Sequence, residues 1–268
     1  MTAADDIERA HLRDPADRSF VIYRYEPPSH LRGLLRRYWI PVWQVPDGEQ
    51  SVQKVLQYPI CLLITTPHYS RFAGPTRGLS TTVLKGKAWG FGAMFTPAAG
   101  ALVLGAPVRT ITDRFVELDY TLPGLTEPLR DLMADDPTSE DAHAAGRSLL
   151  EARLEGRLPL DEESLLVNQI VELVETDSSI MSVTDLCERV GLAERTLQRL
   201  CLRRLGLTPL WLIRRRRLHE ASDQLRSGAI SLAEVAATLG YADQAHFSRD
   251  FKASTGMTPG EFARMQQR

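Results

Sequence analysis

The pattern of apolar and polar residues divides the chain into two parts. Between residues 20 and 95, short runs rich in β-branched and aromatic residues alternate with stretches of turn-forming residues such as proline, glycine and aspartate. This pattern predicts several short strands in a small barrel or sandwich. From residue 125 to 158, leucines recur at intervals of three and four residues, which predicts two helices. A polar stretch at residues 157–164 follows, and we place a domain boundary there.

Two more helices are predicted around these segments. The stretch "TPAAGALVLGA" directly follows the last strand run, with Thr96 as a suitable N-cap and Pro97 at the first helical position. Another helix is predicted to begin at Glu163, where apolar residues again recur with helical spacing. The chain therefore changes from a β pattern to an α pattern and stays helical to its end.

The last third of the chain contains a repeat. Residues 182–209 and 231–259 align with an offset of 49 residues before a central turn and 50 after it. Each copy begins with a serine that can cap a helix, Ser182 or Ser231, and continues to a glycine that can end it, Gly191 or Gly240. A second helix follows in each copy. The repeat therefore predicts two helix-turn-helix units.

The second helix of each unit has an apolar face and a polar face. Leu197 and Leu200 form the predicted inner face of the first, and Phe247 and Phe251 that of the second. Arginine and glutamine suit the base edges of a DNA major groove, and basic side chains suit phosphates. An ordinary solvated surface explains one such helix, but it explains a basic tandem pair less well. The predicted DNA contacts are Arg195, Thr196, Gln198, Arg199 and Arg203 in the first unit and Gln244, His246, Arg249 and Lys252 in the second.

A single helix is predicted between the units, from Pro209 to Gly228. A rod of about 25 Å would hold the two units roughly one turn of DNA, about 34 Å, apart. It contains four consecutive arginines, residues 214–217, which cannot all face one way because a helix turns about 100° per residue. We expect one or two of them to reach a phosphate or an acidic partner and the others to be ordinary surface.

Charge is distributed unevenly between the two parts. From Ser182 to the end there are 14 basic and 9 acidic residues, a net charge of +5, whereas the remainder carries −7. Chance clustering is the alternative, but the asymmetry favours a basic module attached to an acidic one. No apolar run approaches the roughly 20 residues of a membrane helix, and the N-terminus has no secretion pattern. With three cysteines and no evident pairing, these features predict a cytoplasmic protein without membrane association.

At this point the residues match a known family. The last 105 or so residues resemble the DNA-binding domain of AraC/XylS-type transcription regulators, through "GLAERTLQRL", "GLTP" and "ISLAEVAATLGYADQAHFSRDFKASTGMTPGEF". The resemblance implies base contacts by Arg195, Gln198 and Arg199, and by Gln244, with Arg249 nearby on a base or a phosphate.

Two residues depart from the pattern of that family. Cys201 stands where the family usually has phenylalanine, and Arg204 stands where it has an acidic residue. A smaller core side chain and more positive charge are expected to loosen the packing of the first unit and to raise its DNA affinity. A thiol switch between Cys187 and Cys201 is conceivable, whereas buried structural cysteines are the default.

The N-terminal part resembles the effector-type β domains attached to such regulators, in "YEPPSHLRGLLRRYW", "VPDGEQS" and "FTPAAGALVLGAPVRTITDRFVELD". The resemblance implies a cupin-like barrel followed by helices. A barrel lined by aromatic residues can hold an apolar molecule, although core packing is the alternative for each of them. The candidate ligand-binding residues are Trp39, Trp43, Tyr58, Trp89 and Phe91. The histidines of this part are scattered without a His-x-His motif, so neither a metal nor another cofactor is predicted.

The sequence thus predicts an α+β protein of two domains. Residues 1–122 form a β-rich, cupin-like effector domain, residues 123–160 a helical linker and dimerisation region, and residues 161–268 a tandem helix-turn-helix domain. The predicted function is a sequence-specific transcription regulator that reads two successive major-groove segments, is modulated by a small molecule, and has DNA, RNA polymerase and a second copy of itself as partners.

Two alternatives to this function stay open. In the first, the N-terminal domain only dimerises or contacts RNA polymerase, and DNA binding is kept. The second is a cupin-type enzyme or carrier. No paired carboxylates, nucleophile–base pair or phosphate-binding glycine loop is evident in the sequence, so a non-enzymatic protein is predicted.

Overall fold

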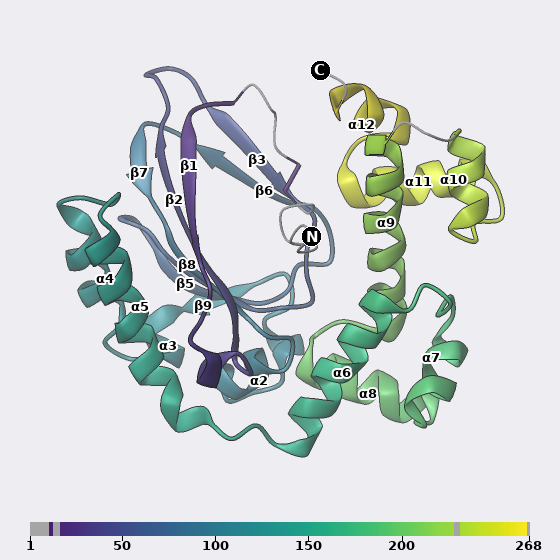
Figure 1. The fold of residues 1–268 in the computed structure, drawn as a ribbon, viewed down its shortest axis with the longest axis horizontal. Helices are drawn as coiled ribbons and strands as arrows, with labels where there is room; N and C mark the ends of the chain where they lie inside the picture. The colour runs from purple at the N-terminus through teal and green to yellow at the C-terminus, as the bar shows by residue number, and fades with distance from the viewer. Residues whose placement is uncertain (1–10, 13–16, 228–230, 267–268) are drawn as a thin grey trace.

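The N-terminal part of the protein is built from antiparallel strands (Figure 1). The computed structural model describes residues 11–12, 17–227 and 231–266. One sheet has seven strands in the order β1-β2-β8-β4-β5-β9 with β7 paired to β2, and β3 and β6 form a separate pair. The strands are β1 (Phe20–Tyr25), β2 (Leu35–Gln44), β3 (Ser51–Val55), β4 (Leu62–Thr65), β5 (Ser70–Ala73), β6 (Ser80–Leu84), β7 (Lys87–Trp89), β8 (Phe91–Phe95) and β9 (Phe115–Glu117).

The seven-stranded sheet buries one face against helices and turns the other toward the β3–β6 pair. Along β2, Tyr38 and Ile40 are buried in the main core, whereas Trp39 and Pro41 line a cavity on the opposite face. This alternation follows from the two-residue period of a strand. The prediction of a small β domain is therefore confirmed, as two antiparallel sheets that face each other across a cavity.

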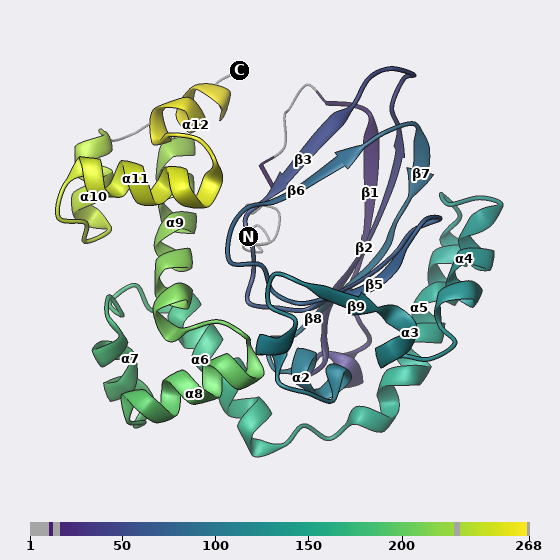
Figure 2. The ribbon, with the colours of Figure 1, turned by 180° about the vertical axis from the view of Figure 1, so that it is seen from behind.

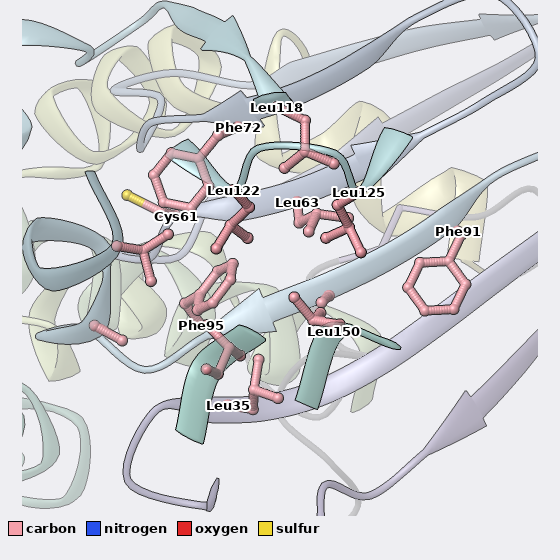
Figure 3. Packing of buried hydrophobic residues seen from close by; sticks show 14 of the residues in the cluster. Leu35, Cys61, Leu63, Phe72, Phe91, Phe95, Leu118, Leu122, Leu125 and Leu150 are labelled. Carbon is pink, nitrogen blue, oxygen red and sulfur yellow. The ribbon is translucent and has the colours of Figure 1, made fainter. Parts of the chain in front are cut away.

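The main core lies between the sheet and helices α4 (Thr126–Ala134) and α5 (Glu140–Leu154). Figure 3 shows how leucine and phenylalanine side chains from the strands interlock with Leu125 and Leu150 from the helical segment. The two predicted helices are confirmed, and they complete the core of the N-terminal part. Two shorter helices, α2 (Ala99–Leu104) and α3 (Leu118–Thr121), close the same end of the sheet (Figure 1).

The start predicted for the short apolar helix was wrong by a few residues. Helix α2 begins at Ala99 with Ala98 as its N-cap, not with Thr96 and Pro97. The hydroxyl group of Thr96 instead donates a 2.7 Å hydrogen bond to the carbonyl oxygen of Gly33. The hydroxyl group of Thr96 therefore bonds to a residue distant in the sequence and does not cap the helix.

The C-terminal part consists of helices joined by turns, with no strand among its described residues. It comprises α6 (Glu162–Thr176), α7 (Val183–Val190), α8 (Glu194–Arg204), α9 (Pro209–Ser227), α10 (Leu232–Thr238), α11 (Gln244–Thr255) and α12 (Pro259–Gln266). The pairs α7–α8 and α10–α11 are the two predicted helix-turn-helix units, and α9 joins them. The predicted end of α9 at Gly228 lies outside the described residues.

The start and the turn of each unit follow the repeat. Ser182 and Ser231 both form capping boxes, with Asp185 and Glu234 respectively. The turns contain Gly191 and Gly240 at φ values of 66° and 69°, which glycine adopts without the strain that a Cβ would bring. The helix-turn-helix prediction is therefore confirmed down to its capping residues.

The two parts of the protein pack against each other along α9. Figures 1 and 2 show this helix beside the sheets, with α10 and α11 toward one of its ends and α7 and α8 toward the other. One hydrophobic cluster joins Leu56 and Ile60 of the N-terminal part to Leu218, Phe251 and Phe262 of α9, α11 and α12. None of the described helices is long and apolar enough to span a membrane.

Candidate nucleic-acid interface

The first unit presents a basic face on α8. Leu197, Leu200 and Cys201 are buried against α6 and α9, so the helix is fixed by one side. Arg195 and Arg199 are exposed on the other side. Gln198 is exposed beside them, and its amide donates a 2.7 Å hydrogen bond to Glu194 one turn earlier. This face can offer guanidinium and amide donors to a DNA groove. Thr196 is half-buried at its margin.

Arg203 and Arg204 lie at the end of α8 and form ion pairs with acidic residues of the same chain. Both contact Glu163 near the start of α6, and Arg204 also pairs with Asp161 at 2.8 Å. With 43% of its side chain exposed, Arg203 thus has an acidic partner within the chain, and its contact with DNA stays a prediction. The arginine that stands where the family has an acidic residue is used to hold α8 to α6.

The second unit presents its polar face on α11. The carboxylate of Asp243 caps this helix by accepting a 2.6 Å hydrogen bond from the backbone N–H of His246. Phe247 and Phe251 are fully buried, and the ring of Phe251 also packs against Phe262 of α12. The four predicted DNA-contacting residues of this helix, Gln244, His246, Arg249 and Lys252, are all exposed.

The cysteines of the first unit serve its packing. Cys201 is fully buried, and burial raises the pKa of its thiol to about 12. Cys187 is half-buried, its pKa is also raised by burial, and both thiols are free. Because the thiolate is the reactive form, these environments favour the structural interpretation over a thiol switch.

The arginine run in α9 is mostly internal. Arg214 is exposed, whereas Arg215 and Arg216 are buried. Arg216 donates to the carbonyl oxygens of Asp177 and Ile180 at 3.1 and 2.8 Å and lies 3.3 Å from Glu220. As expected, two of the four arginines reach acidic partners, but both partners belong to this chain.

Arg215 connects α9 to the N-terminal part. Its Nη1 lies 2.8 Å from Glu175 of α6, and its Nε donates a 2.7 Å hydrogen bond to the carbonyl oxygen of Gln57. Its guanidinium also lies 3.8 Å from the centre of the Tyr58 ring. Arg36 approaches the same ring at 5.2 Å. The segment at residues 56–58 is therefore a docking point for the helix that joins the two units.

Further contacts lie at the first unit and at the start of α9. The hydroxyl group of Thr112 donates a 2.9 Å hydrogen bond to the carbonyl oxygen of Gly206, and the indole N–H of Trp211 donates one of 2.9 Å to that of Arg77. The β domain thus holds both helix-turn-helix units, the first through Gly206 and the second through the shared hydrophobic cluster.

A cavity of about 220 Å³ lies between the large sheet and the β3–β6 pair. Two of the five candidate ligand-binding residues, Trp39 and Tyr58, line it. Trp43 lies along a separate surface groove, and Trp89 and Phe91 are buried in the main core. Trp39 of β2 pairs with Gly92 of β8, so alternation along β8 puts the neighbouring Phe91 on the opposite face of the sheet, which a list of aromatic residues does not reveal.

Sequence reasoning did not select several residues that line the cavity. These residues include Arg24 and Arg37, as well as Ile22, Ile64 and Met94. Alternation along the strand could have identified Arg37, because Arg37, Trp39 and Pro41 share one face of β2. Among the described residues, no group of three histidine, cysteine or acidic side chains is placed to hold a metal ion.

Comparison with known proteins identifies the C-terminal part. A family model described as a helix-turn-helix domain matches residues 186–265, and one described as a domain of unknown function (DUF6597) matches residues 23–117. The HTH-type transcriptional activator RhaR of Cronobacter sakazakii is 34% identical over 73 residues, which cover 27% of this chain and 26% of that protein. The putative AraC-like transcription regulator of Streptomyces lividans is 33% identical over 81 residues, covering 30% and 27%.

The chain thus spans about a quarter of the length of these curated relatives. Among solved structures, ToxT from Vibrio cholerae O395 is matched over 93% of this chain and 99% of its own, with 13% identity and a TM-score of 0.38. The C-terminal part belongs to the helix-turn-helix class of DNA-binding domains. More specifically, residues 186–265 match the helix-turn-helix family model, and this part of the chain is similar to the putative AraC-like regulator of Streptomyces lividans.

Proposed function

We propose that the protein is a sequence-specific DNA-binding transcription regulator. The observation that carries this proposal is the pair of exposed polar faces on α8 and α11, each fixed by a buried apolar side. Arg195 and Arg199 on one helix and Gln244 and Arg249 on the other suit base edges and phosphates. The 33–34% identity of this region to transcription regulators supports the same role.

The linking helix supports a bipartite DNA site. Helix α9 has 19 residues, which correspond to a length of about 28 Å. Since each unit adds its own width, the two reading helices suit successive major-groove segments about 34 Å apart. A continuous helix also fixes the angle between the units, so we infer a strict spacing between the two half-sites.

We further propose that a small molecule in the cavity of the β domain modulates DNA binding. The segment at residues 56–60 supports this proposal because it lines the cavity and also contacts α9. Leu56, Gln57, Tyr58 and Ile60 line the cavity, and Gln57 and Tyr58 also contact Arg215 of α9. A ligand that moves this segment changes the docking of the helix that joins the two units.

The DNA proposal is tested by selection from a random duplex library with the full-length protein. We expect a bipartite consensus and a steep loss of affinity with rising salt. Arg199→Ala and Arg249→Ala should each weaken specific binding by about 1–3 kcal/mol, because each removes a potential base contact. Arg264→Ala, an exposed arginine on α12, is the matched control. A library without enrichment, together with an affinity that does not depend on salt, would refute the proposal.

The other predicted partners stay predictions from the family resemblance. Within the predicted dimerisation region at residues 123–160, Leu150 and Leu154 of α5 pack on the sheet of their own chain. Dimerisation through residues 123–160 and a contact with RNA polymerase both stay predictions. The proposed role is non-enzymatic and places the protein with its DNA in the cytoplasm.

A further inference from the structure

The cavity between the sheets has walls of mixed character. Ile22, Ile64 and Met94 give it apolar surface from three strands of the large sheet, and Ser80 and Thr82 of β6 face it from the other side. Its volume of about 220 Å³ exceeds the roughly 150 Å³ that is enough for benzene in an engineered apolar cavity. A molecule with one ring or a short alkyl chain fits this volume, and a larger ligand would have to extend through the mouth.

Two guanidinium groups belong to the same lining. Arg24 of β1 lies directly opposite Trp39 in the β1–β2 ladder, and Arg37 is two residues from Trp39 on β2. All three side chains therefore share the face that looks into the cavity, and the two arginines are diagonal neighbours, about 7–8 Å apart at their Cα atoms. Arg24 is exposed at the rim, whereas Arg37 is half-buried.

The depth of Arg37 makes it the stronger anion site. Burial lowers the pKa of Arg37 below its ordinary value, yet a guanidinium stays protonated at neutral pH. A positive charge in partly desolvated surroundings attracts an anion more strongly than a charge in water does. The planar fork of arginine also fits a carboxylate with two parallel hydrogen bonds.

We propose that this cavity binds a small aromatic or short-chain aliphatic carboxylate, with the carboxylate at Arg37 and Arg24 and the apolar body against Trp39, Ile64 and Met94. A regulatory role for this binding rests on the proposed function, in which the wall of this cavity contacts α9. The binding itself does not depend on DNA. It requires an anionic head and an apolar body in one molecule.

Isothermal titration of the full-length protein with paired probes tests the proposal. Benzoate and hexanoate are compared with their neutral counterparts, benzamide and hexan-1-ol. We expect at least one carboxylate to bind at least tenfold more tightly than its neutral counterpart. Binding of both members of a pair with equal affinity, or binding of neither carboxylate, would overturn the proposal. DNA binding is measured separately by a mobility-shift assay in the absence of these small molecules. Failure of the DNA proposal is therefore recognised independently.

Variants then locate the anion site. Arg37→Met should weaken carboxylate binding at least tenfold and leave the neutral probes unchanged, and Arg37→Lys should retain part of the affinity. Arg32→Met is the matched control, because Arg32 is exposed and does not line the cavity. If Arg37→Met lowers the melting temperature strongly, Arg24→Met at the exposed rim takes its place, with a smaller expected loss. Unchanged carboxylate affinity in the folded variant would contradict the assignment.

Discussion

Arg215 is a charged side chain in the interior of the protein, and its partners come from separate segments. Glu175 contributes a carboxylate, Gln57 a carbonyl oxygen and Tyr58 an aromatic face. Burial of a guanidinium is costly, and these contacts offset that cost. The same residue holds together α6, α9 and the β domain.

We expect Arg215→Met to lower the free energy of unfolding by about 3 kcal/mol, because it leaves the partly buried carboxylate of Glu175 without its 2.8 Å partner. Urea denaturation of the full-length protein followed by circular dichroism measures this loss. The control is Arg214→Met, which changes the exposed neighbour and should alter stability by less than about 0.5 kcal/mol. Equal effects of the two substitutions would show that Arg215 is not a structural cation.

Burial of single residues was predicted unevenly from the sequence. Phe247 and Phe251 were assigned correctly to the inner face of their helix, since helical spacing decides it. One or two arginines of residues 214–217 were expected to reach a phosphate or an acidic partner, but the sequence did not say which. Arg215 pairs with Glu175, and a helical pattern does not reveal a carboxylate that lies 40 residues away. Local periodicity predicts which side a residue takes, whereas the partner that makes burial of a charge tolerable depends on the tertiary fold.

At the scale of elements, the helix-turn-helix units were the most predictable part of the structure. Their serine caps, glycine turns and apolar positions are local features, and they occur twice. The N-terminal strands were predicted as a group, but the pairing of β3 with β6 apart from the large sheet was not. Strand pairing depends on contacts between distant residues, and a single sequence does not specify them.

Helix α6 begins with an ionised cap whose contribution should depend on pH. Asp161 accepts a 2.7 Å hydrogen bond from the backbone N–H of Ser164 and pairs with Arg204, and its contacts with these two residues lower its pKa from 3.8 to about 2. A carboxyl group whose pKa is lower in the folded state stabilises the protein above its unfolded pKa. That contribution is lost as the pH falls from 3.8 through about 2.

We expect Asp161→Asn to lower the free energy of unfolding at pH 7 by less than about 1 kcal/mol, because the carboxylate is largely exposed. Asparagine still caps the helix, so the substitution isolates the charge. Urea titrations at several pH values should show the difference from the parent protein shrinking below pH 4. A difference that stays constant down to pH 2 would mean that the charge of Asp161 contributes nothing.

At the scale of the whole molecule, Gly206 lies where the N-terminal part packs against the first unit. Its φ is 70°, and a Cβ at this position would overlap the hydroxyl oxygen of Thr112 and lie 3.2 Å from the carbonyl carbon of Val108. Gly191 has a similar φ of 66° but nothing within 4 Å of such a Cβ. The two glycines therefore differ in whether the other domain lies against them.

Gly191→Ala should cost about 1–2 kcal/mol, the usual penalty of a left-handed alanine. Gly206→Ala should cost at least about 1 kcal/mol more, because it also disturbs the hydrogen bond from Thr112. Urea denaturation gives both values, and limited proteolysis should reveal faster cleavage between the two parts in the second variant alone. Equal losses would indicate that the domains do not stay in contact in solution.

The segment at residues 56–60 faces the cavity on one side and α9 on the other, so the proposed function implies that ligand binding in the cavity and DNA binding by the two units are thermodynamically linked. Linkage is reciprocal: if a ligand changes the affinity for DNA by some factor, DNA changes the affinity for the ligand by the same factor. Two operators that require different relative positions of the helix-turn-helix units would then bind the ligand-loaded protein with different changes in affinity. Two promoters could respond at different ligand concentrations without any change in the protein.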